Sequence, residues 1–281
     1  RRDGASIVAI EEPESHLHPA AIHQLNEVIQ SLGEENQVIL TTHNPLFVDR
    51  KDIKSNIIVD KGKALPAKST QQIRDLLGIK ASDNLTNASY VLVVEGADDV
   101  IALRALLSHL SESLEKLIDS HMLIIEQIGG AGNLPYKLTS LTNSLCVYHC
   151  FLDNDEAGRS AYELAENEDL LSIKSTTLVN CNGSPDAELE DCFNLELYKG
   201  GVFNEFGVDL SCQEFRGNAK WSNRVRQAFL GQGKPWDNGV KSRVKFCVAE
   251  HVRKSPAESL NQHKRNSIDA LVQSIETMTK S

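Results

Sequence analysis

The chain has 281 residues, a formal net charge of −10 at pH 7 and 41% hydrophobic residues. This composition excludes a disordered or collagen-like chain and is typical of a soluble globular protein long enough for two domains. No apolar run approaches the ~18 residues of a membrane-spanning helix, and the six cysteines form no CxxC pair. We therefore expect a cytoplasmic protein whose thiols are mostly structural.

The charge is unevenly distributed along the chain. Residues 211–254 contain ten Lys or Arg and three Asp or Glu, so this basic segment carries +7 and the remainder carries −17. An acidic body with one basic segment suits a metal-dependent enzyme that acts on a polyanion, although an ordinary solvated basic face would give the same count.

The first 65 residues alternate between strand and helix patterns. Residues 6–10, 38–40 and 57–59 are apolar strands, and apolar residues recur at helical spacing from Ile22 to Leu32, between Pro19 and Gly33. Continuous apolar strands separated by a helix predict a parallel or mixed sheet covered on both faces. From about residue 63 the sequence is polar and broken, with one short helical piece around 73–77, and we interpret residues 66–88 as a linker.

A second α/β pattern follows the linker. Its predicted strands are 90–94, 122–125, 145–152 and 176–179. A glycine-rich turn follows the second strand, and a helix begins at Ala157 after the third. This alternation requires right-handed crossovers and places ligands at the carboxyl ends of the strands. Beyond about residue 200 the pattern is helical. The final apolar stripe, Ile268 to Met278, predicts a helix that faces the core, with a partner-helix seam as the alternative.

Acidic residues collect at the predicted strand ends. Glu95 directly follows a strand, with Asp99 one helical turn later, and Asp153 and Asp155 follow another strand, where alternation points both side chains the same way. Carboxylates gathered at one edge repel one another unless a cation neutralises them, so their convergence predicts a divalent metal site suited to Mg²⁺ or Mn²⁺. Taken singly, the same acids are equally well explained as a helix cap and a turn.

Two sets of motifs resemble known families. Val93-Val94-Glu95-Gly96-x-x-Asp99 and Leu152-Asp153-x-Asp155-x-x-Gly158 resemble the TOPRIM domain shared by topoisomerases, bacterial primases and OLD-family (overcoming lysogenisation defect) nucleases. Residues 7–19 resemble the Walker B strand and D-loop of ABC-type ATPases. Residues 41–45, with His43, resemble the segment that carries the switch histidine of these ATPases. An ABC-type ATPase followed by TOPRIM is the layout of OLD-family endonucleases, relatives of which act in phage defence. The resemblance covers residues 5–192 well and the rest loosely.

This resemblance implies an α/β fold in four parts. Residues 1–65 would be the C-terminal piece of an ABC-like ATPase sheet, 66–88 a linker, 89–195 a TOPRIM domain with a Rossmann-like parallel sheet, and 196–281 a mainly helical, basic C-terminal region. Glu11 would stand at the usual Asp position of the Walker B pair, Glu12 would polarise the attacking water, and His43 would sense the γ-phosphate. The sequence has no Gly-x-x-x-x-Gly-Lys-Ser/Thr phosphate loop. We therefore expect a fragment that binds and hydrolyses ATP only together with a missing N-terminal part.

The resemblance also implies a Mg²⁺- or Mn²⁺-dependent DNA endonuclease. Asp153 and Asp155 would coordinate metal, Glu95 would coordinate it or act as general base, and Asp99 and Glu190 would hold a second ion or its waters. A charged helix start is the alternative explanation of Glu190. Lys245 resembles a C-terminal lysine that reaches the scissile phosphate and stabilises transition-state charge. The residues expected to contact the DNA backbone include Arg224, Arg226, Lys241 and Arg243, and we expect Trp221 and Trp236 to be packing residues.

Other functions fit less well. A topoisomerase needs a nucleophilic tyrosine on a separate domain, and a primase needs a zinc ribbon or a helicase-interacting domain. The remaining alternative is a non-catalytic DNA-repair ATPase or recombination scaffold that uses TOPRIM for assembly, and the joint presence of Glu95, Asp99, Asp153 and Asp155 favours the nuclease instead. The resemblance further implies a dimer and a possible defence-system partner protein.

Overall fold

The computed structural model describes residues 7–15, 17, 19–49, 52–60, 62–77 and 88–280. They divide into two compact units, one of residues 1–86 with 142–145 and one of residues 87–141 with 146–281. His16 and His18 of the D-loop-like motif and residues 78–87 of the predicted linker lie outside the described residues. Among the helices that the structure describes, none combines the length and the apolar character needed to span a bilayer.

The first unit begins with a strand–helix–strand motif. Strands β1 (Ile7–Glu11) and β2 (Gln37–Thr41) pair in parallel, and α1 (Pro19–Glu35) connects them, continuing past the predicted stop at Gly33. The prediction of a sheet covered on both faces is wrong within this unit. Ile7 is 67% exposed and Ile39 52% exposed, because alternate strand residues point to opposite faces and α1 packs on one of them.

A hairpin and a short helix complete the first unit. Strands β3 (Ile57–Asp60) and β4 (Lys63–Pro66) pair antiparallel, and α2 (Thr70–Leu77) follows. The start of the segment expected to be polar and broken is therefore a strand. Gly62 adopts a positive φ of 75° in the turn, a conformation that glycine takes without steric cost. Two 3-10 helices, η1 (Pro45–Phe47) and η2 (Ile53–Ser55), lie between β2 and β3.

The second unit is built on a parallel four-stranded sheet. The strands, in the spatial order β6-β5-β7-β8, are β6 (Leu123–Gln127), β5 (Tyr90–Val94), β7 (Val147–Leu152) and β8 (Thr176–Leu178). Each neighbouring pair is parallel, which confirms the predicted α/β fold. In the inner strand β5, residues Val91 to Val94 are fully buried, as expected for a strand covered on both faces.

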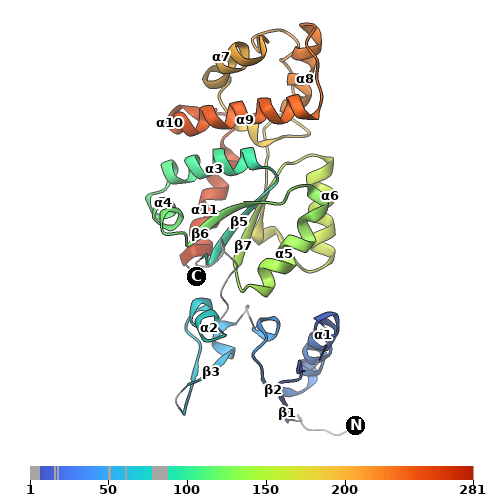
Figure 1. The fold of residues 1–281 in the computed structure, drawn as a ribbon, viewed down its shortest axis with the longest axis vertical. Helices are drawn as coiled ribbons and strands as arrows, with labels where there is room; N and C mark the ends of the chain where they lie inside the picture. Colours follow the sequence, from blue (N-terminus) through green and yellow to red (C-terminus); the bar gives the residue numbers. More distant parts are fainter. Residues whose placement is uncertain are drawn as a thin grey trace. The chain divides into compact units, whose positions relative to one another are not determined.

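Helices cover both faces of this sheet (Figure 1). On one side lie α3 (Ala97–Leu110), α4 (Glu112–Asp119) and α11 (Asn266–Lys280), and on the other α5 (Leu134–Asn143) and α6 (Glu156–Asn167). Ile268, Leu271 and Ile275 of α11 are fully buried, and the helix contacts β7 and β8. The C-terminal stripe therefore faces this chain's own core, as the first interpretation predicts.

The remaining helices form a layer next to α3. They are α7 (Leu195–Phe206), α8 (Trp221–Gly231), α9 (Asn238–Lys254) and α10 (Pro256–Ser259), and α9 packs against both α3 and α7. Trp221 is fully buried and donates its Nε1 hydrogen to the Tyr198 hydroxyl at 3.1 Å, while Trp236 packs edge-on against Phe229. Both tryptophans are packing residues, as predicted. None of the six cysteines, all of which the structure describes, forms a disulfide, and five are buried.

Three short 3-10 helices complete the second unit: η3 (Ala131–Asn133), η4 (Ile173–Ser175) and η5 (Leu189–Cys192). Buried residues of the sheet, of η5 and of helices α7 to α9 belong to one hydrophobic core. This shared core holds α9 against α3 and α7, next to the predicted site residues.

Candidate active site

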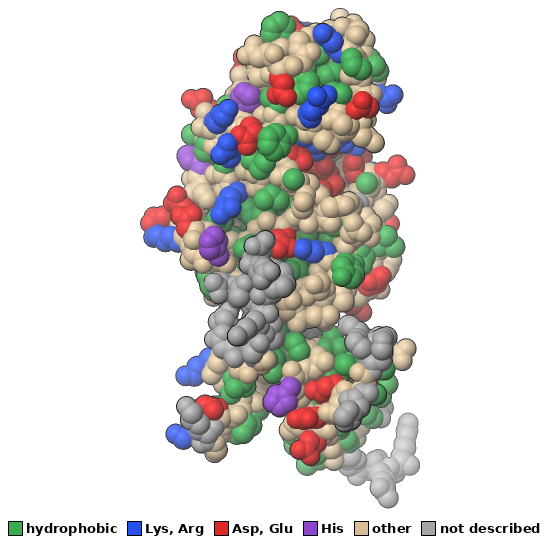
Figure 2. Space-filling view, in the orientation of Figure 1, with side chains coloured by type: hydrophobic (Ala, Val, Ile, Leu, Met, Phe, Trp, Pro, Cys, Tyr) green, Lys and Arg blue, Asp and Glu red, His purple; other side chains and the backbone are tan. Residues whose placement is uncertain are grey.

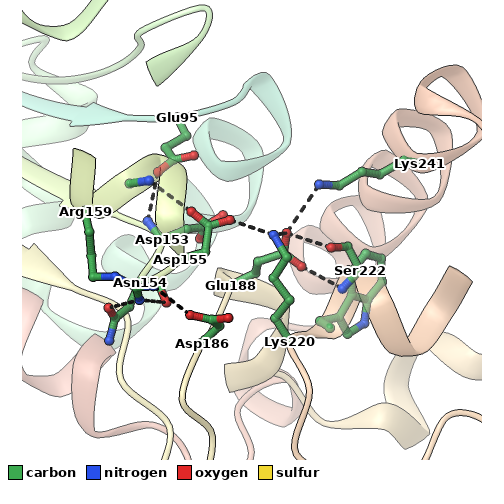
Figure 3. Close-up of polar contacts among 12 residues, drawn as sticks. Glu95, Asp153, Asn154, Asp155, Arg159, Asp186, Glu188, Lys220, Ser222 and Lys241 are labelled. Atoms are coloured by element: carbon green, nitrogen blue, oxygen red, sulfur yellow. Dashed lines mark hydrogen bonds and ion pairs between the residues drawn. The ribbon is translucent and has the colours of Figure 1, made fainter. Parts of the chain in front are cut away.

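Glu95 and Asp153 meet at the carboxyl edge of the sheet. Strands β5 and β7 are parallel neighbours, so the residues that follow them emerge side by side. The backbone N–H of Asp153 donates to Glu95 Oε1 at 3.1 Å (Figure 3). Burial raises the pKa of Glu95, and the Asp155 carboxylate adds to this rise, while the Asp153 hydrogen bond and Lys245 oppose it. A carboxylate with a raised pKa is suited to taking up a proton near neutral pH.

The approach between these strand ends requires Gly158 in α6. A Cβ atom at this position would overlap the backbone carbonyl oxygen of Asp153 and lie 3.1 Å from Glu95 Oε1. Glycine is thus required here by the space around it, and the Gly158 position of the Asp153-x-Asp155-x-x-Gly158 motif has a steric explanation in this fold.

Lys245 lies among three carboxylates. Its Nζ is 3.1 Å from Glu190 Oε2, 3.9 Å from Asp153 Oδ2 and 3.9 Å from Asp98 Oδ2. The side chain is only 12% exposed. Burial lowers the pKa of Lys245, but the surrounding carboxylates, Glu190 first, hold it well above its ordinary value. Lys245 therefore stays protonated and is the internal counter-charge of the cluster.

Asp98, Asp99 and Glu190 offer oxygen atoms that all lie within 4.8 Å of one another. Asp99 Oδ2 accepts the Gly96 N–H at 2.8 Å and so caps α3, whereas Asp99 Oδ1 is buried and has no hydrogen-bond partner among the described residues. Burial raises the pKa of both Asp99 and Glu190 to about 8, against the opposing effect of Lys245. Buried carboxylates with a spare oxygen match the hard ligand set of Mg²⁺ or Mn²⁺.

Asp153 connects the sheet edge to η5. Its Oδ1 accepts the Leu189 N–H at 3.0 Å, and its pKa is raised by burial despite the nearby ammonium of Lys245. Because Leu189 precedes Glu190 in η5, this bond fixes the element that carries Glu190. The structure thereby brings four of the five predicted metal ligands close enough to Lys245 to interact with its charge: Glu95, Asp99, Asp153 and Glu190.

Asp155 is placed differently from the sequence-based expectation. Strand β7 ends at Leu152, so the strand-alternation argument for Asp155 is wrong: this residue is the N-cap of α6. Its Oδ1 accepts the Gly158 N–H at 2.9 Å, and its Oδ2 lies 2.6 Å from Lys220 Nζ. Burial alone would raise the pKa of Asp155, but these hydrogen bonds, that of Lys220 first, hold it below its ordinary value.

Glu188 and Lys220 belong to the cluster but were missed by the sequence analysis. Glu188 Oε1 lies 3.4 Å from Lys220 Nζ and 3.3 Å from Lys241 Nζ, and Glu188 also accepts the Ser222 N–H at 2.6 Å and the Ser222 hydroxyl at 2.9 Å (Figure 3). Burial raises the pKa of Glu188, but three lysines, Lys245 first, bring it below its ordinary value. The run of acids around Glu190 was the only local signal that could have identified Glu188.

Asp191 connects η5 to the start of α8. Its Oδ2 accepts the N–H groups of Glu188 and Trp221, each at 3.0 Å, and its Oδ1 pairs with the Arg224 guanidinium. Arg224 was predicted to contact the DNA backbone, but its side chain is only 11% exposed and it also donates to the carbonyls of Phe215 and Ala219. The structure therefore assigns Arg224 a structural contact within the chain.

The other predicted backbone contacts differ in their surroundings. Lys241 pairs with Glu188, Arg243 lies over the Phe206 ring at 5.9 Å, and Arg226 is exposed. Figure 2 shows Lys and Arg side chains interspersed with acidic and apolar ones on the face it presents. On that face, the Lys and Arg side chains do not form one continuous patch.

The ATPase-like residues lie in the first unit. Glu11 ends β1 opposite Thr41 of β2, and Glu12 Oε1 lies 3.4 Å from His43 Nε2. Glu14, which the sequence analysis did not single out, pairs with the Thr42 hydroxyl and accepts the His43 N–H at 3.0 Å. The Walker B-like strand and the switch-like histidine therefore lie next to each other.

Comparisons with known proteins match both units. Residues 1–49 match the family described as "AAA domain, putative AbiEii toxin, Type IV TA system". The chain is also 27% identical over 189 residues to the protein named Old nuclease from Escherichia phage P2. That match covers 62% of this chain and 31% of the relative, so the chain spans less than a third of the relative's length.

The match to an ATPase family at the N-terminus and the match to the Old nuclease agree with the order of motifs along the sequence. Together they support the resemblance of this chain to OLD-family ATPase–nucleases.

Proposed function

We propose that this chain comes from an OLD-like ATPase–nuclease and that its second unit cleaves DNA phosphodiester bonds with Mg²⁺ or Mn²⁺. The observation that carries the proposal is the convergence of acids from β5, β7, α3 and η5 around one buried lysine, Lys245. Perturbed carboxylates gathered at the carboxyl edge of a parallel sheet are typical of catalytic sites. In this proposal residues 89–195 are a TOPRIM domain, and residues 196–281 complete its site from outside.

The oxygen donors divide into two neighbouring groups. Asp98, Asp99 and Glu190 would hold one divalent ion, and Glu95 with Asp153 would hold or face another. Asp155 would join the second group only if its oxygen left Lys220, because both of its oxygens have partners. Bound ions would supply an activated water and relieve negative charge on the phosphoryl oxygens.

The chain's own residues would perform the remaining tasks. Glu95, whose pKa is raised by burial, would take the proton from the attacking water. Lys245 would direct its fixed positive charge at the negative charge that develops on the phosphate, and its nearly complete burial would strengthen that interaction. Asp153 would orient η5 through Leu189 and so position Glu190.

The first unit would serve the ATPase of the longer protein. Glu11, Glu12 and His43 would take the Walker B and switch roles, with ATP as the bound nucleotide. A homodimer, a defence-system partner, and roles in phage defence or DNA repair are further proposals that rest on the resemblance alone. So is the expected location in the cytoplasm.

Plasmid nicking tests the proposal. We expect the chain to nick supercoiled DNA with Mg²⁺ or Mn²⁺ but not with EDTA, and we expect Glu95→Gln to abolish nicking. Glu112→Gln is the matched control, because Glu112 is an exposed acid of α4 that pairs only with Lys116 among the described residues. If the wild-type chain bound DNA but did not cleave it even with Mg²⁺ or Mn²⁺, the nuclease would be refuted and the assembly scaffold supported.

A further inference from the structure

A polar hollow lies outside the carboxylate cluster. It measures about 390 Å³ and is formed by the segment that precedes α8 together with the first turns of that helix. Arg216 and Arg226 line it with the side-chain amides of Asn223 and Gln227, and Glu214 is its one acid. This volume falls within the range of small-ligand sites, so the hollow is large enough for the phosphate and sugar of one nucleotide unit.

The hollow offers mainly hydrogen-bond donors. Arg216 and Arg226 are exposed, and neither forms an ion pair within the part of the chain that the structure describes. A guanidinium presents a planar set of N–H donors that matches the oxygens of a phosphate group. Arg224, the third arginine of the lining, is held by Asp191 and by the Phe215 ring at 4.6 Å. Arg224 is therefore held in place as part of the lining, and Arg216 and Arg226 are the arginines available to bind an anion.

The wall of the hollow continues into the carboxylate cluster. Ala219 of the lining precedes Lys220, whose Nζ is 2.6 Å from Asp155. Asn223 follows Ser222, which binds Glu188 through both its N–H and its hydroxyl. Consecutive Cα atoms are only about 3.8 Å apart. The segment from Ala219 to Asn223 therefore links the carboxylate cluster to the hollow, and a strand that follows this segment away from the carboxylates reaches the hollow.

We propose that this hollow binds a phosphate of the nucleic-acid strand that flanks the phosphodiester bond to be cut. The inference rests on the proposed nuclease function and adds to it a binding site through Arg216 and Arg226. A nucleic-acid strand fits the lining better than a free nucleotide does. The lining contains no aromatic side chain on which a base could stack, and Ala219 is its one apolar residue.

The test compares two double variants of the 281-residue chain. Arg216→Gln/Arg226→Gln removes the two arginines of the hollow. Arg253→Gln/Arg265→Gln is the control, because it removes the same charge from arginines that pair with Glu250 and Asp269 on other helices. Binding of a fluorescent DNA duplex would be measured by anisotropy in EDTA across a salt series. Nicking would be measured with Mn²⁺ at low and at saturating DNA.

We expect the hollow variant to lose about tenfold in affinity at moderate salt and its log–log salt slope to fall by about 1 to 2, since each phosphate contact contributes about 0.9. Its nicking rate at saturating DNA should match that of the control. Equal affinity of the two variants would overturn the inference, as would a loss of nicking rate without a loss of affinity. Competition by inorganic phosphate or ATP as strong as that by the duplex would assign the hollow to a free anion instead. A wild-type chain that binds DNA through these arginines but never nicks it would refute the proposed function and leave the binding site intact.

Discussion

Replacing Lys245 with methionine should destabilise the second unit in a way that depends on both pH and metal. At an effective dielectric constant of about 20, an ion pair is worth roughly 5 kcal/mol at 3.1 Å and roughly 4 kcal/mol at 3.9 Å. These are the distances from Lys245 Nζ to Glu190 and to Asp153 or Asp98. Desolvation of the ammonium offsets much of this gain. Removing one partner of a buried pair typically costs about 3–5 kcal/mol, and we expect this loss at pH 8.

The loss should be smaller at pH 6. With pKa values of about 8, Asp99 and Glu190 are largely protonated there, so fewer negative charges remain unpaired when Lys245 is removed. A divalent cation should restore stability to Lys245→Met more than to the wild type, because the ion can replace the missing positive charge.

The measurement is urea unfolding followed by tryptophan fluorescence. Both tryptophans, Trp221 and Trp236, lie in the second unit, so the signal reports on that unit alone. Curves would be recorded at pH 6 and pH 8, each with EDTA and with Mn²⁺. Lys116→Met, which removes an exposed lysine of α4, is the control and should change stability by less than about 1 kcal/mol. The reasoning is refuted by a loss that is equal at both pH values and unaffected by Mn²⁺.

Three further predictions follow from the same contacts. The metal-free second unit should lose stability as pH rises from about 4 toward 8, because Asp99 and Glu190, with pKa values of about 8, keep protons in the folded state that the unfolded chain releases. Mn²⁺ should bind more tightly as pH rises over the same range. Calorimetry in buffers of different ionisation heat should then show that metal binding releases protons. Gly158→Ala should lower the free energy of unfolding by about 1–3 kcal/mol and remove most of the nicking activity, because its Cβ would overlap the Asp153 carbonyl. The control, Gly200→Ala in α7, has open space around its Cβ and should leave stability unchanged or slightly increased. Equal effects of the two substitutions would contradict the steric argument. Asp191→Asn should destabilise the second unit by about 2–4 kcal/mol in the urea assay, because this one carboxylate bonds to Glu188, Trp221 and Arg224. An unchanged unfolding midpoint would show that these contacts are dispensable.

Local sequence determined the elements that carry the first part of the site. The apolar run of β5 ends at Val94, and that of β7 ends at Leu152. Because parallel neighbours end at the same edge, the meeting of Glu95 and Asp153 could be predicted from these two runs and the helices between them. Even the N-cap role of Asp155 has a local signal, since aspartate is a preferred residue directly before a helix.

Local sequence also misled at a few positions. The hairpin strand Lys63–Pro66 is too short to show a strand period, and its pairing with Ile57–Asp60 supplies the order that its composition does not indicate. The prediction that β1 and β2 are covered on both faces came from their continuous apolar runs. Such runs show that the strand residues can be buried, but not how many layers of helices cover the sheet in this unit.

Tertiary structure alone decided which charges face one another. Asp98 and Asp99 are adjacent in the sequence and equally acidic, yet only the packing of α9 against α3 brings Lys245 within 3.9 Å of Asp98. Lys220 and Glu188 are likewise brought together by packing, because the start of α8 contacts the segment that leads into η5. Apolar periodicity is a local property that fixes strands and helices, whereas the distance between two charges far apart in the chain depends on how those elements pack. The sequence therefore determined the sheet and its acidic edge, and only the packed fold determined the lysines that neutralise it.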